Sequence, residues 1–87
     1  MMFTVKFKPS VKKDWRKIPA SLRRNIEVVL GELRVDPTPF GSRQLQGYTH
    51  TYRIRIGNYR IIYEVHREVR IVRIMRIQDR KDAYKGL

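Results

Sequence analysis

The residues from Tyr52 to Val65 constrain the fold more than any other part of the chain, because they predict a β-hairpin. Apolar or aromatic residues occupy every second position over residues 52–56 and again over residues 59–65, which is the period of a half-buried strand. The two segments are separated only by Gly57-Asn58, and glycine at the first position is typical of a type II′ turn. We therefore expect two antiparallel strands joined by a two-residue turn.

This turn also predicts the register of the hairpin, with one apolar face and one basic face. The expected pairs are Ile56 with Tyr59, Arg55 with Arg60, Ile54 with Ile61, Arg53 with Ile62, and Tyr52 with Tyr63. Like charges directly opposite each other destabilise a sheet. Two interpretations follow: the basic face binds an anion that relieves the repulsion, or it is a solvated face whose long side chains spread apart.

The remaining segments predict a compact α+β domain that spans residues 1–87. Residues 3–8 alternate as a first strand, and Ser10 is a plausible N-cap of a short helix that Pro19 ends. A longer helix follows, with an apolar stripe at i, i+4, i+7, i+8 and i+11. We expect these helices to form an antiparallel hairpin on a small, mostly antiparallel four-stranded sheet.

A last strand is predicted from Val69 to about Ile77, followed by a turn or a single helical turn over residues 79–84. The sequence leaves its register open, because apolar residues occur at both parities. A two-residue loop would direct Val72 and Ile74 to the core, whereas a three-residue loop would direct Ile71 and Arg73 there.

Charge and composition narrow the function classes. The net charge of +12 indicates a polyanionic partner, either nucleic acid or an acidic protein. The chain has no cysteine, and its two histidines lack metal-ligand spacing, so we expect neither a metal nor a cofactor. No apolar run approaches the roughly 20 residues of a membrane span, and no signal-peptide core is visible, so we expect a cytoplasmic protein with no membrane partner.

A cluster of arginines with a tyrosine is the strongest candidate for chemistry. Guanidinium groups bind phosphate bidentately and stabilise the charge of a phosphoryl transition state, and tyrosine can stack on a base or move a proton. Such a set suits single-stranded RNA whose own 2′-hydroxyl attacks the neighbouring phosphate, because the protein then supplies no nucleophile. The candidates are Arg53, Arg55, Arg60, Arg80 and Tyr84.

The chain resembles the RelE/ParE superfamily of toxins from toxin–antitoxin systems. The resemblance rests on Leu45-Gln46-Gly47, on the hairpin from Tyr52 to Tyr63, and on Arg80-Lys81-Asp82-Ala83-Tyr84. It implies a RelE-like fold. The RelE branch, which the chain resembles more, consists of messenger-RNA endonucleases that cut in the ribosomal A site. The resemblance also implies an acidic RelB-like antitoxin as a partner, in addition to the ribosome and messenger RNA.

The same resemblance implies roles for individual residues. Arg60 lies at the position of the phosphate-stabilising arginine, Arg80 at that of a second catalytic arginine, and Tyr84 at that of a C-terminal tyrosine. Arg53 and Arg55 lie where the branch often has lysines, so they are expected to bind RNA, although each could equally contact the antitoxin. Arg55 is also a catalytic candidate. The general base stays open among Glu64, Asp79 and Tyr84, or the rate rests mainly on positioning and arginine electrostatics.

Two other functions remain. A ParE-like toxin would poison DNA gyrase and cut no RNA, with the same fold but usually without the full set of arginines and tyrosine. A non-enzymatic RNA-binding module or a decayed toxin would retain the charge without the chemistry.

Overall fold

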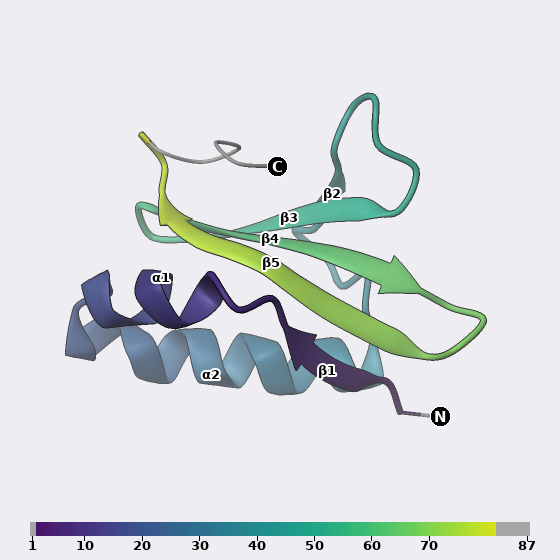
Figure 1. Cartoon of the computed structure of the whole chain (residues 1–87), viewed down its shortest axis with the longest axis horizontal. Coiled ribbons are helices and arrows are strands. Elements are labelled where there is room, and N and C mark those ends of the chain that lie inside the picture. Colours follow the sequence, from purple (N-terminus) through teal and green to yellow (C-terminus); the bar gives the residue numbers. More distant parts are fainter. Residues whose placement is uncertain (1, 82–87) are drawn as a thin grey trace.

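The computed structural model describes residues 2–81, which form two helices and a five-stranded sheet. Both helices lie on one face of the sheet (Figure 1), as the sequence predicted for an α+β domain. The elements are β1 (Thr4–Phe7), α1 (Val11–Lys17), α2 (Ala20–Val35), β2 (Arg43–Gln44), β3 (Thr51–Ile56), β4 (Tyr59–His66) and β5 (Ile71–Asp79).

The strands follow the order β1-β5-β4-β3-β2 across the sheet. The strand β1 pairs in parallel with β5, and every other neighbouring pair is antiparallel. The predicted sheet had four strands, and β2 is the fifth. It has only two residues, too few for any periodicity to reveal it.

The β3–β4 hairpin has the predicted register. Arg55 lies opposite Arg60, and Ile54 lies opposite Ile61. Gly57 has a φ of +58°, as the first central residue of a type II′ turn requires. The hairpin therefore presents Ile54, Ile61 and Tyr63 to the helices, and its three arginines, together with Ile62, to the opposite face.

The strand β5 begins later than predicted, at Ile71, because residues 67–70 form a four-residue loop. A four-residue loop directs the same side chains of β5 to the core as the two-residue loop would. Val72 and Ile74 are accordingly fully buried. A β-bulge then shifts the register: Ile62 lies opposite Arg76, whereas Tyr63 lies opposite Ile74. The bulge allows both Ile74 and Ile77 to face the core, which explains why apolar residues occur at both parities.

The core lies between the helices and the sheet. Ile26 and Leu33 of α2 and Ile61 and Tyr63 of β4 are completely buried there. Trp15 is half-buried against this core, and the Arg23 guanidinium lies 5.7 Å from the centre of its ring.

The structure also tests the predicted helix cap and the predicted absence of a membrane span. Ser10 occupies the predicted N-cap of α1, but its side chain makes no capping hydrogen bond. No helix within residues 2–81 is long and apolar enough to cross a membrane.

Candidate functional site

Two directly opposed pairs of arginines lie on the face of the sheet that points away from the helices. Arg55 and Arg60 are directly opposed across β3 and β4, and Arg43 is directly opposed to Arg53 across β2 and β3. Residues opposite each other share a face, and the flanking Ile54 and Ile61 belong to the core on the other side. We call this set the arginine face: Arg43, Arg53, Arg55 and Arg60.

The end of β5 borders the arginine face. Gln78 lies opposite Arg60, and Arg80 follows two residues later. The backbone N–H of Arg80 donates a 2.8 Å hydrogen bond to the carbonyl of Asn58 in the hairpin turn. Arg60 and the backbone of Arg80 are therefore at the same end of the sheet. Tyr84 lies outside the described residues.

Arg43 was missed by the sequence analysis. The short strand that carries it is held by the loop that follows, where the Leu45 N–H donates to the Thr51 carbonyl at 2.8 Å and the Gln44 amide donates to the carbonyls of Tyr48 and Thr49. Figure 1 shows this loop rising beyond the sheet on the side opposite the helices. In the sequence, Arg43 is a single arginine shortly before Leu45-Gln46-Gly47, with no pattern around it. Its relation to the hairpin comes only from the pairing of β2 with β3.

Two candidates for the general base, Asp79 and Glu64, both lie away from Arg60. Asp79 lies opposite Tyr59, which packs against the core, so its register assigns it to the helix side of the sheet. Its carboxylate accepts a 3.0 Å hydrogen bond from the Lys81 N–H. Glu64 is on the same side of β4 as Arg60 but four residues away, about 13 Å along the strand.

Glu64 interacts with a neighbouring histidine. Its carboxylate lies 3.0 Å from Nε2 of His66, whose ring is 5.7 Å from that of His50. His66 is the last residue of β4. Within residues 2–81, no group of three or more His, Cys, Asp or Glu could hold a metal ion.

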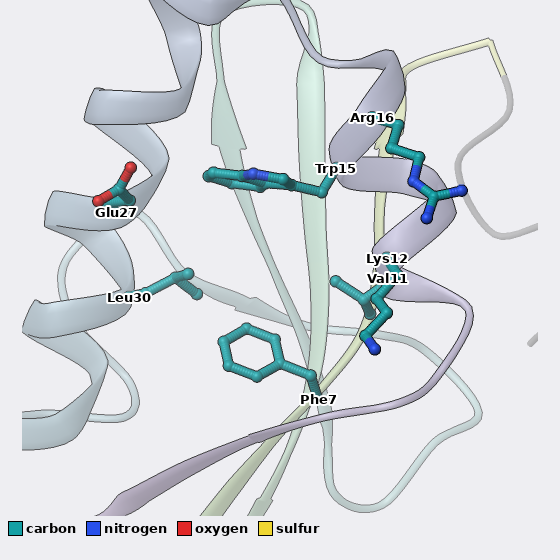
Figure 2. Close-up of a pocket in the computed structure, with 7 residues that line it drawn as sticks. All are labelled: Phe7, Val11, Lys12, Trp15, Arg16, Glu27 and Leu30. Carbon is teal, nitrogen blue, oxygen red and sulfur yellow. The ribbon is translucent and has the colours of Figure 1, made fainter.

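A separate apolar groove of about 450 Å³ lies between α1, α2 and the end of β1. Figure 2 shows the rings of Phe7 and Trp15 and the side chain of Leu30 directed into the same space. Phe7 is 53% exposed there, although it is a large apolar residue. Lys12, Arg16 and Glu27 also line the groove. Exposed apolar surface that is bordered by charge is typical of a protein-binding site.

Comparison with known proteins gives the family. Residues 5–84 match the profile of the family described as ParE toxin of type II toxin-antitoxin system, parDE. The chain belongs to the RelE/ParE superfamily of toxins. This agrees with the resemblance found in its sequence.

Relatives of this toxin are named as RelE-type toxins. It is 34% identical over 89 residues to the putative toxin RelE1 of Methanocaldococcus jannaschii, with 99% of each chain covered. It is 30% identical to toxin RelG of Mycobacterium tuberculosis, over 98% of this chain and 99% of that protein.

Solved structures agree with the fold. The archaeal RelE–RelB complex from Pyrococcus horikoshii superposes with a TM-score of 0.82 at 28% identity, over 95% of this chain and 100% of that chain.

Proposed function

We propose that the protein is the toxin of a toxin–antitoxin system and acts as a ribosome-dependent messenger-RNA endonuclease. The observation that carries this proposal is the opposition of Arg55 and Arg60 on the sheet face that points away from the helices, with Arg53 beside them and the backbone of Arg80 at the same end. Such a set of cations is unfavourable without an anion between them. A single-stranded RNA backbone supplies that anion.

The proposed reaction needs no nucleophile from the protein. The substrate 2′-oxygen attacks the adjacent phosphorus, the bond from phosphorus to the 5′-oxygen breaks, and the products are a 2′,3′-cyclic phosphate and a 5′-hydroxyl. The 2′-hydroxyl loses its proton and the leaving 5′-oxygen gains one. Arg60 and Arg80 stabilise the additional negative charge on the phosphoryl oxygens, while Arg53 and Arg55 orient the backbone.

Tyr84 is proposed to position the reacting nucleotide. Asp79 is disfavoured as the base because its register assigns it to the helix side, and Glu64 because of its distance from Arg60. The proposal therefore rests the rate chiefly on alignment of the substrate and on arginine electrostatics.

The test is cleavage of messenger RNA on programmed ribosomes, read by primer extension. Arg60→Ala and Arg80→Ala should each lower the single-turnover rate about 10²–10³-fold, the effect of removing one transition-state donor. Their melting temperatures should stay near that of the wild type, because Arg80 is exposed and Arg60 is only partly buried. Arg24→Ala, on the exposed surface of α2, is the matched control. Wild-type rates in the first two variants would refute these roles.

A second candidate is supported by the family description, which names the ParE toxin. A ParE-like protein would inhibit DNA gyrase without cutting RNA. A supercoiling assay with purified gyrase separates the two: we expect no inhibition at concentrations at which ribosomes are cleaved. Inhibition of gyrase without RNA cleavage would favour the second candidate.

We also propose an acidic antitoxin as the neutralising partner. The net charge of +12 attracts an acidic chain, and the apolar groove provides area for hydrophobic burial that the arginine face lacks. An amphipathic segment with apolar residues on one side and carboxylates beside Lys12 and Arg16 fits this combination. A small acidic protein encoded in the neighbouring open reading frame is the first candidate to test.

A further inference from the structure

We propose that Asp14 is a positioning residue of this enzyme, because its carboxylate fixes the segment of β5 that leads to Arg80. The inference rests on the proposed function and adds a residue that does not touch the RNA. Asp14 is 5% exposed, and its partners are on a strand more than sixty residues away.

Asp14 can contact β5 because β1 covers only the first part of that edge of the strand. The strand β1 pairs with β5 only from Thr4 opposite Ile71 to Phe7 opposite Ile74. Beyond Ile74 the helix α1 lies beside β5, and the Asp14 carboxylate accepts a hydrogen bond from the Ile77 N–H at 2.9 Å. A side chain thus takes the hydrogen bond that an adjacent strand would otherwise accept.

The same carboxylate binds Arg76. Nε of Arg76 lies 3.0 Å from Oδ2 of Asp14, and Nη2 lies 3.0 Å from Oδ1, so the ion pair is bidentate. Bidentate pairs restrict orientation more than single contacts do. Removing one partner of a buried ion pair leaves the other charge unpaired, so the packing of α1 against β5 depends on Asp14.

The position of this pair at the bulge connects it to the proposed site. Arg76 lies opposite Ile62, where the register of β4 and β5 shifts by one residue. Bulges make a strand bend locally, so an anchor at Ile77 limits how far the following residues can move. Three residues later, about 10 Å along the chain, the Arg80 N–H reaches the Asn58 carbonyl. A shift of about 1 Å at a catalytic group can lower a rate 10²-fold.

Asp14→Ala removes both contacts, and Asp14→Asn retains the volume and one carbonyl oxygen but loses the charge. We expect kcat on programmed ribosomes to fall about hundredfold and about tenfold respectively. The KM for ribosomes should change less than twofold, because the arginine face is intact. The control is Asp36→Ala, which removes an exposed carboxylate that accepts the Thr38 N–H in the loop after α2. The rates are normalised to the concentration of folded protein. If Asp14→Ala does not fold, the test of the positioning role rests on Asp14→Asn.

Amide hydrogen exchange reports on the hydrogen bond from the Arg80 N–H to the Asn58 carbonyl, whether or not the protein cleaves RNA. In Asp14→Asn the Arg80 amide should exchange at least tenfold faster, whereas the Leu45 amide, bonded to Thr51 at the other edge of the sheet, should not change. Unchanged exchange at Arg80 would overturn the proposal, and so would an unchanged kcat per folded molecule, which a merely stabilising role predicts. A wild-type protein that cuts no RNA would instead refute the proposed function, with the exchange experiment still testing the position of Arg80.

Discussion

At the residue scale, the opposed arginines are the least expected feature of the chain. Two pairs of like charges, Arg55 with Arg60 and Arg43 with Arg53, lie side by side on neighbouring strands. Each pair destabilises the sheet by some tenths of a kcal/mol in the absence of an anion. A bound polyanion reverses this effect, so the arginine face is better suited to binding an anion than to stabilising the fold.

Arg43 is expected to contribute one phosphate contact. Replacing it in Arg43→Gln should weaken binding of a short single-stranded RNA and reduce the slope of log K against log salt by about 0.7. Fluorescence anisotropy over a series of salt concentrations measures both effects. Arg24→Gln, with the same change of charge on α2, should leave the slope as it is. An unaltered slope in Arg43→Gln would remove this residue from the RNA site.

Tyr63 gives the fold a dependence on alkaline pH. Burial raises the pKa of Tyr63 from 10.0 to about 12, and its hydroxyl donates a 2.8 Å hydrogen bond to the Pro37 carbonyl. Between these values the unfolded chain loses the proton while the folded chain keeps it. The stabilisation is therefore complete below pH 10 and is lost as the pH rises towards 12.

Tyr63→Phe should lower the free energy of unfolding by about 1 kcal/mol at pH 8, because it leaves the Pro37 carbonyl unpaired. It should also remove the contribution of Tyr63 to the loss of stability between pH 10 and 12. Urea unfolding at pH 8 and pH 11 measures both quantities. Tyr48→Phe is the control, since Tyr48 is 47% exposed. Equal alkaline destabilisation in Tyr63→Phe and the wild type would contradict the assignment.

At the scale of elements, the β3–β4 hairpin determines where the arginines meet. Its turn requires Gly57 to adopt a φ of +58°, which L-residues rarely adopt. An added Cβ would meet only the side chain of Leu22, at an ordinary distance of 4.0 Å, so the cost of a substitution comes from the backbone.

Gly57→Ala should therefore destabilise the protein by about 1 kcal/mol, equivalent to a fall of about 4–8 °C in Tm. Gly57→Asn should lose about as much, because the first central position of a type II′ turn lies in a backbone region that only glycine adopts readily. Thermal unfolding by circular dichroism measures both variants. A wild-type Tm in both would show that the turn conformation does not require glycine.

At the scale of the whole molecule, the arginine face and the apolar groove are on opposite sides of the sheet. The groove lies between α1, α2 and the end of β1 (Figure 2), and the strand register assigns the arginine face to the other side of the sheet from the helices. Substitutions in the groove should therefore affect binding of the proposed antitoxin without altering RNA cleavage.

Phe7→Ser removes an aromatic ring that is 53% exposed in the groove and should weaken antitoxin binding about tenfold, which corresponds to the loss of roughly half of a buried aromatic contact. Phe40→Ser is matched in chemistry, because Phe40 is fully exposed outside the groove. Isothermal titration with the antitoxin measures the affinities, and the ribosome assay measures the rates. Equal affinities for the two variants would exclude the groove from the antitoxin interface.

The sequence by itself determined the elements whose causes are local. The helical stripe from Leu22 to Leu33, the alternation on both sides of Gly57-Asn58 and the opposition of Arg55 to Arg60 all depend on residues that are close in the chain. Periodicity and turn chemistry are sufficient to predict such features. The resemblance to the RelE/ParE superfamily rests on the same stretch.

Only the tertiary structure decided the features that depend on contacts between distant segments. The two residues of β2 are a strand because β3 lies beside them, and this pairing brings Arg43 to the site. The bulge at Ile62 arises where β5 must supply both Ile74 and Ile77 to one core. Asp14 gains its partners because β1 ends before β5 does, so that a helix residue meets the free strand edge. Such contacts leave no periodic pattern in the chain, because each is set by where two separate elements end.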